Sequence, residues 1–130
     1  MSDDVEQPCG ELAIRALAMP ADTNPRGDIF GGWLLGQMDV AAGITAWSRA
    51  QGKVATVGIE KVTFLQPVKV GDTVNIYAEV IRIGTTSLTV RVQVWVERRS
   101  ELHRLVKVTE GTFTFVAIDD AGRKRPVPPS

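Results

Sequence analysis

One carboxylate stands out as a candidate for chemistry. Asp39 is the only charged residue in the apolar stretch Ile29–Ser48, which reads IFGGWLLGQMDVAAGITAWS. A carboxylate in such surroundings is costly unless it is paired, hydrogen-bonded or used, which favours a functional role. As a general base Asp39 would activate a water molecule, and as a nucleophile it would attack a carbonyl carbon itself. The sequence leaves both routes open.

Asp28 and the glycine pair Gly31–Gly32 form a second candidate group at the predicted start of the same helix. The first backbone N–H groups of a helix have no intrahelical acceptor, so they can point at an oxygen that gains negative charge during a reaction. Glycines there let a substrate approach the backbone closely. A simpler interpretation is that Asp28 only caps the helix and the glycines form a tight turn.

The spacing of the two aspartates has a structural consequence. They are 11 positions apart (39 − 28), which along a helix corresponds to about three turns or roughly 16 Å. One carbonyl group cannot contact both carboxylates across that distance. If both serve one reaction, they must come from two subunits, and a dimer would then be required for catalysis.

The stretch that carries these residues predicts a long buried helix. About 20 apolar residues can also cross a bilayer, but this stretch contains four glycines, Gln37 and Asp39. A central Asp costs roughly 2.5–3.5 kcal/mol on insertion scales, which argues against a membrane span. Because the helix is apolar around most of its circumference, the rest of the chain is expected to wrap it.

Strands are predicted to supply this wrapping. Between Thr86 and Glu97 apolar and polar residues alternate, which is typical of an antiparallel strand buried on one face. The apolar face would consist of Leu88, Val90, Val92, Val94 and Val96, and the other face of Thr89, Arg91, Gln93, Trp95 and Glu97. Composition and turn residues predict four more strands: the short Glu11–Ala18 and the long Val54–Leu65, Asp72–Ile83 and Leu105–Ile118.

This order predicts an α+β fold in which a curved antiparallel sheet of about five strands surrounds one long helix. A helix of about 18 residues is roughly 27 Å long, which a strand of about eight residues matches. A small sheet has exposed edges with unpaired backbone groups, so pairing with a second copy is expected. We predict a homodimer.

The composition limits the number of domains and the classes of protein to which the chain can belong. The chain has 130 residues, of which 44% are hydrophobic, and its 15 Lys and Arg balance 15 Asp and Glu. This predicts a single domain over residues 11–120, with a flexible leader (1–10) and a basic, proline-rich tail (121–130). The charge balance argues against nucleic-acid or anionic-membrane binding. One cysteine and one histidine argue against a metal site, and the acidic, polar start, without an export signal, predicts a cytoplasmic protein.

The stretch Met19–Gly43, MPADTNPRGDIFGGWLLGQMDVAAG, resembles acyl-CoA thioesterases of the hotdog superfamily. The likeness is to the small bacterial single-domain acyl-CoA hydrolases, which are related to the double-domain cytosolic acyl-CoA hydrolase of animals. It extends from about Leu12 to Pro126 and includes TVGIEKVTFLQPVKVGDTV and GTFTFVAIDDAGRKRPVP; the GDIFGG block followed by QMD is its most specific part. The resemblance implies a hotdog fold and hydrolysis of acyl-CoA to a free acid and coenzyme A.

The resemblance also implies roles for individual residues. Asp39 matches the catalytic aspartate of the family, and related enzymes have Asn or Asp at the position of Asp28. Asn24 is expected to contact the substrate. The turn Gly84, Thr85, Thr86 and Ser87 offers N–H and hydroxyl groups near coenzyme A, and Arg123 and Lys124 could meet its phosphates. The alternatives are an ordinary hairpin turn and solvated charges.

Coenzyme A would be part of substrate and product, so no separate cofactor is expected. Related enzymes suggest hexamers built as trimers of dimers. Two other functions remain open on the sequence. A hotdog dehydratase would need a His paired with an acid near the helix, and the only His, His103, is far downstream. A non-catalytic acyl-CoA-binding or regulatory module would make Asp39 structural.

Overall fold

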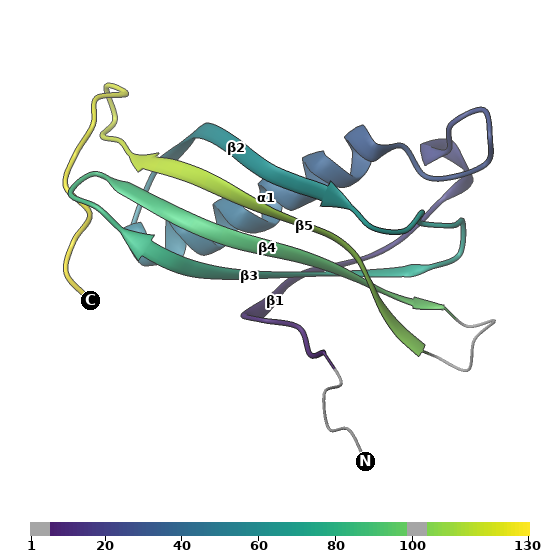
Figure 1. Ribbon diagram of the computed structural model, residues 1–130. Helices are drawn as coiled ribbons and strands as arrows, with labels where there is room; N and C mark the ends of the chain where they lie inside the picture. Colours follow the sequence, from purple (N-terminus) through teal and green to yellow (C-terminus); the bar gives the residue numbers. More distant parts are fainter. Residues whose placement is uncertain (1–5, 99–103) are drawn as a thin grey trace, which may run out of the picture.

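The computed structural model describes residues 6–98 and 104–130, which form one long helix and five strands (Figure 1). In chain order the elements are β1 (Glu11–Leu17), the 3-10 helix η1 (Pro20–Asp22), α1 (Gly31–Ala50), β2 (Val54–Phe64), β3 (Thr73–Ile83), β4 (Ser87–Arg98) and β5 (Arg104–Ala117). Each predicted strand is present, and α1 begins and ends two residues later than the predicted Ile29–Ser48. Among the described residues, no helix combines the length and apolarity that a membrane span requires.

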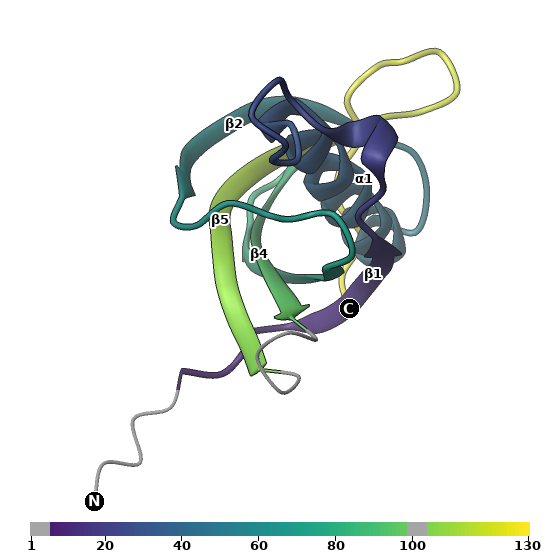
Figure 2. The same cartoon turned by 90° about the vertical axis from the view of Figure 1, so that its right-hand side faces the viewer.

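The five strands form one antiparallel sheet in the order β1-β3-β4-β5-β2. Seen end-on, the sheet curves around α1, so that the helix lies inside the concave face (Figure 2). The two edge strands are β1 and β2. This is the α+β arrangement that the sequence predicts.

The core lies between α1 and the concave face of the sheet. The predicted apolar face of β4 is fully buried from Leu88 to Val96. On the helix side, the buried residues include four alanines: Ala41, Ala42, Ala46 and Ala50. Their small side chains let the sheet pack close to the helix axis, while Phe113 and Phe115 of β5 fill the remaining space.

The chain does not wrap the whole helix, and to this extent the sequence-based expectation is wrong. Val40, Ile44 and Trp47 recur at spacings of four and three, and each is more than half exposed (54%, 52% and 52%). Five strands cover only one side of a helix, because the sheet ends at β1 and β2. The chain therefore leaves an apolar helix face, defined by these three residues, for another molecule to cover.

The pairing of edge strand β2 with β5 shifts register twice. The first shift lies between Thr56 and Gly58, at Val57, which is 60% exposed, while Ile59 is 42% exposed. The second shift lies between Glu60 and Thr63, and Lys61 in that interval has a left-handed φ of 57°. Such a bulge bends the strand away from a regular ladder.

Part of the convex face of the sheet is buried, although the alternation in β4 predicts that this face is exposed to solvent. Gln93 and Trp95 lie on the predicted polar face of β4, yet they are only 3% and 4% exposed. Residues of the predicted leader contact this face: the Cys9 N–H donates to Gln93 Oε1 at 2.9 Å, and Glu6 pairs with Lys107. The rest of the predicted leader, residues 1–5, lies outside the described residues.

The same face carries an ionic network around Glu110. Its carboxylate accepts a hydrogen bond from Lys107 Nζ at 2.7 Å and from Gln93 Nε2 at 2.7 Å. The Lys107 hydrogen bond is the main cause that lowers the pKa of Glu110 below its ordinary value of 4.5. A lowered pKa in the folded state means that the ionised carboxylate stabilises the fold.

We therefore expect Glu110→Gln to lower the free energy of unfolding near neutral pH but not in acid. The contribution of Glu110 is fully present above its unfolded pKa and is lost as the pH falls through the lower folded pKa. Urea unfolding of both proteins between about pH 7 and pH 3 measures the difference. Glu11→Gln, at an exposed carboxylate of β1, is the control; a difference that persists undiminished in acid would contradict this account.

Candidate functional site

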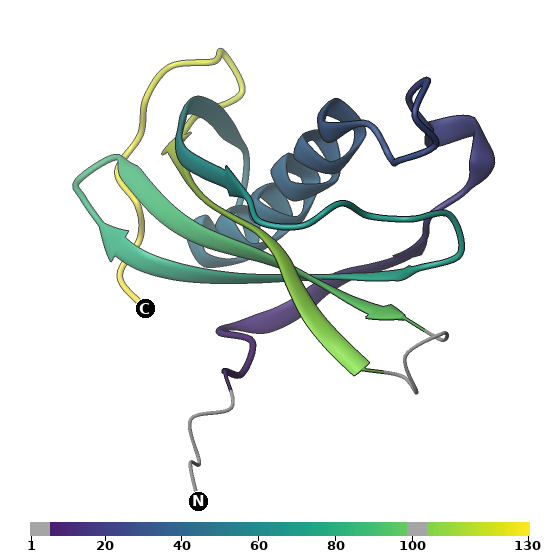
Figure 3. The ribbon, with the colours of Figure 1, turned by 45° about the vertical axis from the view of Figure 1, so that its right-hand side comes forward.

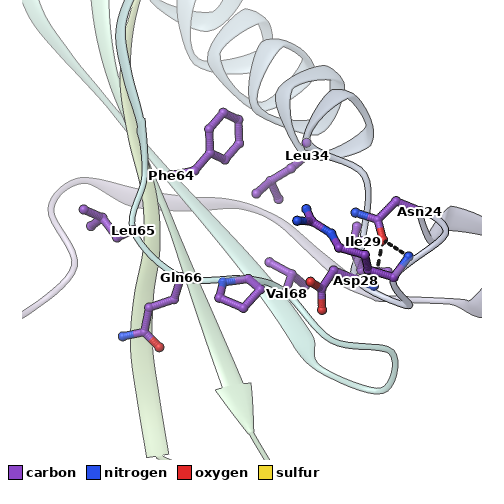
Figure 4. Close-up of a pocket in the computed structure, with 11 residues that line it drawn as sticks. Asn24, Asp28, Ile29, Leu34, Phe64, Leu65, Gln66 and Val68 are labelled. Atoms are coloured by element: carbon purple, nitrogen blue, oxygen red, sulfur yellow. Dashed lines mark hydrogen bonds between the residues drawn. The ribbon is translucent and has the colours of Figure 1, made fainter.

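The chain enters α1 through a tight turn that the side chain of Asn24 closes. Asn24 Oδ1 accepts the backbone N–H of Arg26 at 2.9 Å and of Asp28 at 3.1 Å. Since the oxygen is used by two backbone donors, the amide has one orientation, and its Nδ2 has no hydrogen-bond acceptor among the described residues. In Figure 4 this nitrogen points away from the turn and into the pocket in front of α1.

Asp28 does not cap the helix, so the simpler sequence interpretation is wrong. The N-cap residue is Phe30, and no side chain caps this end of α1. Asp28 Oδ1 instead pairs with Lys69 Nζ at 2.5 Å, because a bridge places the two residues side by side. The hydrogen bond from Lys69 is the main cause that lowers the pKa of Asp28, which keeps the carboxylate ionised.

Gly31 and Gly32 open α1 with bare backbone. A Cβ at Gly32 would meet nothing within 4 Å, and one at Gly31 would reach the Phe64 ring only at an ordinary contact distance of 3.5 Å. Packing therefore does not require glycine at either position. What the pair does is leave the first N–H groups of the helix uncovered, where an incoming oxygen could accept their hydrogen bonds.

A pocket of about 320 Å³ lies in front of this helix end (Figure 4). It combines an apolar wall with a polar rim. The wall includes Ile29, Leu34, Phe64, Leu65 and Val68, and the rim Asn24, Arg26, Asp28 and Gln66. A pocket with an apolar wall and hydrogen-bond donors on one side fits a ligand that has an apolar chain and a polar group.

Asp39 lies outside this pocket. It is half-buried on α1, eight residues beyond Gly31, which is about 12 Å along the helix axis. Its Oδ1 accepts a hydrogen bond from Thr56 Oγ1 of β2 at 2.8 Å. Sequence reasoning missed Thr56, because only the position of β2 beside the helix brings the two residues together. Asp28 lies before the helix, so the roughly 16 Å separation predicted along one helix axis does not apply. Asp39 nevertheless lies outside the pocket that Asp28 lines.

The predicted coenzyme A residues lie at the other end of the chain's long axis. The Gly84–Ser87 turn joins β3 to β4 at the end of the sheet where α1 ends, and the loop with Arg123 and Lys124 projects from the same end, after β5 (Figure 1). The structure thus brings together Asn24, Asp28, Gly31 and Gly32 at one end, and places the Gly84–Ser87 turn and the loop with Arg123 and Lys124 at the other. Asp39 lies between these ends. His103 lies outside the described residues.

Comparison with known proteins gives consistent matches. The sequence model of the thioesterase superfamily matches residues 26–103 of this chain. The acyl-CoA thioester hydrolase YciA of Salmonella typhimurium is 50% identical over 123 residues, covering 93% of this chain and 92% of the relative. Among solved structures, a hexameric thioesterase from Yersinia pestis superposes with a TM-score of 0.91 at 51% identity, covering 95% of this chain and 100% of the other.

A third match comes with ligands. An acyl-CoA hydrolase from Staphylococcus aureus, solved in complex with butyryl coenzyme A, coenzyme A and coenzyme A disulfide, is 35% identical with a TM-score of 0.82. The alignment covers 88% of this chain and 70% of that one. Together these likenesses confirm the predicted fold class and the resemblance that the sequence suggested.

Proposed function

We propose that this chain, which belongs to the thioesterase superfamily, hydrolyses acyl-CoA thioesters to a free carboxylic acid and coenzyme A. The observation that carries the proposal is that one helix holds both a hydrogen-bonded carboxylate, Asp39, and an uncapped N-terminal end that faces a partly apolar pocket. The names of the relatives and the butyryl coenzyme A of the Staphylococcus aureus structure support the same substrate class.

The helix end would polarise the thioester carbonyl. The N–H group of Gly31 and the fixed amide Nδ2 of Asn24 are hydrogen-bond donors on one side of the pocket, and the N–H of Gly32 follows in the same first turn of α1. Donors held in place before the reaction stabilise the negative charge that develops on the carbonyl oxygen. Asp28, ion-paired with Lys69, would hold the turn that presents Asn24, rather than contact the oxygen itself.

Asp39 would supply the attack on the carbonyl carbon. As general base it takes a proton from water, the hydroxide adds to the carbon, and the tetrahedral intermediate collapses with the coenzyme A thiolate as leaving group. As nucleophile it adds to the same carbon, the C–S bond breaks with the coenzyme A thiolate as leaving group, and water hydrolyses the resulting mixed anhydride to the free acid and the Asp39 carboxylate. Thr56 donates to Oδ1 in either case, which orients the carboxylate and leaves Oδ2 for the reaction.

A second copy of the chain would complete the site. Asp39 is about 12 Å along the axis from the helix end, and the exposed helix face of Val40, Ile44 and Trp47 needs a cover. We therefore propose a homodimer with active sites at the interface, assembled into hexamers as trimers of dimers; the Yersinia pestis neighbour is hexameric.

The nucleotide half of coenzyme A would meet the other end of a chain, where the Gly84–Ser87 turn offers N–H and hydroxyl groups and Arg123 and Lys124 offer charge. The reaction needs acyl-CoA and water, and coenzyme A is part of substrate and product. We propose that the reaction takes place in the cytoplasm, since a single cysteine fits a reducing compartment.

Thiol release tests the proposed function. Purified protein is incubated with acyl-CoAs of increasing chain length and a thiol reagent, and release of coenzyme A is followed over many turnovers. Hydrolysis of at least one chain length is expected, and the panel identifies the preferred substrate. Tight binding of acyl-CoA without thiol release would reject hydrolysis in favour of the binding module.

A substitution of Thr56 tests how Asp39 is oriented. We expect Thr56→Val to lower kcat by about tenfold, because one hydrogen bond to a charged group, worth roughly 1.5 kcal/mol, is lost while the shape is kept. Thr56→Ser keeps the hydroxyl and should keep most of the activity. Steady-state kinetics of both variants gives the answer; equal kcat values for the two would show that the hydroxyl does not orient the base.

A further inference from the structure

The last part of the chain lies across the end of α1 rather than trailing from the domain. We define the strap as residues 125–128. The Arg125 guanidinium donates to three backbone carbonyl oxygens: those of Ala50 at 3.1 Å, Ile118 at 2.8 Å and Lys53 at 3.4 Å. Ala50 is the last residue of α1, so one of these bonds satisfies a carbonyl that the helix itself leaves without a donor.

The surroundings of Arg125 fit a long guanidinium side chain. Gly52 beside it has a φ of 152°, and a Cβ there would lie only 2.9 Å from Nη2 of Arg125. The Arg125 N–H also bonds to the Ala117 carbonyl at 3.0 Å. At the other end of the strap, Arg49 Nη1 donates to the Pro128 carbonyl at 2.6 Å. The strap is therefore held at both ends.

Between these ends the strap holds the turn that joins β3 to β4. The Val127 N–H donates to the Thr85 carbonyl at 2.8 Å, and the Ala117 N–H donates to the Thr86 carbonyl at 2.8 Å. Figure 3 shows the C-terminal segment passing behind this turn. The hydroxyls of Thr85 and Thr86 have no hydrogen-bond partner within residues 6–98 and 104–130. The backbone of the turn is fixed while its side chains stay available.

Directly before the strap, a second turn, which we call the basic turn (residues 119–124), carries the side chains of Arg123 and Lys124. Asp119 Oδ1 accepts the N–H of Ala121 and of Arg123, each at 2.9 Å, and the Asp119 N–H bonds back to the Arg123 carbonyl at 2.8 Å. Arg123 and Lys124 are exposed, and in the described part of the chain neither has an ion-pair partner. Hydrogen bonds to Asp119 fix the backbone of the basic turn, and its two cationic side chains remain available to bind an anion.

We propose that the strap is a positioning device that holds the Gly84–Ser87 turn and the basic turn in the arrangement that receives the phosphate-bearing nucleotide half of coenzyme A. The inference rests on the proposed function. Its physical basis is that flexible binding elements must be ordered when the ligand binds, and this ordering weakens affinity. Arg125 and Val127 would do that ordering in advance without contacting the substrate.

Two variants remove the strap's bonds separately. Arg125→Met removes the guanidinium bonds and keeps the side-chain length, and Val127→Pro removes the N–H that bonds to Thr85 while it replaces an apolar side chain packed against the core by another apolar one. Arg104→Met makes the same chemical change at the opposite end of β5 and is the control. Each protein is assayed with an acyl-CoA and with the N-acetylcysteamine thioester of the same acyl group, which has the reacting bond but no nucleotide. Thermal unfolding identifies any variant that is not folded at the assay temperature.

The measured quantity is the ratio of the KM for acyl-CoA to the KM for the short thioester. In at least one strap variant that is folded, we expect this ratio to rise roughly three- to tenfold, with little change in kcat for the short thioester and no change of the ratio in Arg104→Met. An unchanged ratio in the folded variants, including equal losses with both substrates, would overturn the proposal. Failure of the unsubstituted protein to hydrolyse either thioester would instead reject the proposed function.

Discussion

Asp39→Asn is expected to lower kcat for acyl-CoA hydrolysis by at least about 100-fold. The amide keeps the size of the carboxylate and can still accept the hydrogen bond from Thr56, but it can neither take a proton from water nor form an anhydride. Steady-state thiol release measures the loss. Asp22→Asn, the same change in η1, should leave kcat unchanged. Retention of more than about a tenth of the activity in a folded Asp39→Asn protein would remove Asp39 from the mechanism.

A single turnover in ¹⁸O-labelled water then examines the two routes that remain for Asp39. If Asp39 acts as general base, the labelled oxygen enters the released carboxylic acid and none enters the protein. If Asp39 forms an anhydride and water attacks the aspartyl carbonyl, the label is found on Asp39 after the first turnover. Mass spectrometry of the acid and of the peptide that contains Asp39 reads both products, and label on the peptide selects the nucleophilic route.

Mixed assemblies should recover activity that neither parent has. We expect Asn24→Asp and Asp39→Asn proteins to be nearly inactive alone and to regain about a quarter of the unsubstituted activity when their chains are exchanged in equal amounts. Asn24→Asp keeps the oxygen that accepts the two turn N–H groups and removes the amide donor. The quarter follows because half of the random pairs are mixed, and each mixed pair has one intact site of two.

Subunit exchange must be verified for this test, for instance by isolating mixed pairs through two different affinity tags. The matched control exchanges each variant with itself, which should recover nothing. Verified mixed pairs without activity, formed from two inactive parents, would show that Asn24 and Asp39 of the same chain serve one site. This result would overturn the proposed interface site.

The fold was predictable from the sequence where one pattern decides the outcome. The alternation in β4 places Leu88 to Val96 inside, and these residues are buried. The same alternation placed Gln93 and Trp95 on a solvent face, but both are buried, and Gln93 accepts a hydrogen bond from the backbone of Cys9. A period of two gives the side on which a residue lies. It does not give what lies against that side, because the covering residues come from another part of the chain.

The site was predictable to the same extent. Asp39 was found because a lone charge in an apolar helix is conspicuous, and its role stays a prediction. Its partner Thr56, and the partner Lys69 of Asp28, could not be found, because they are 17 and 41 positions away in sequence and only strand register and loop path bring them close. Lys69 also explains why Asp28 does not cap the helix as an isolated Asp would.

The irregular pairing of β2 bears on how chains can associate. An exposed edge strand can template the addition of further strands, and a long, regular one leads to open-ended ribbons and insoluble aggregates. Here two register shifts, between Thr56 and Gly58 and between Glu60 and Thr63, and the left-handed Lys61 interrupt the free edge. We expect these irregularities to oppose open-ended strand addition, so that apolar side chains exposed on the edge are compatible with a closed, finite assembly.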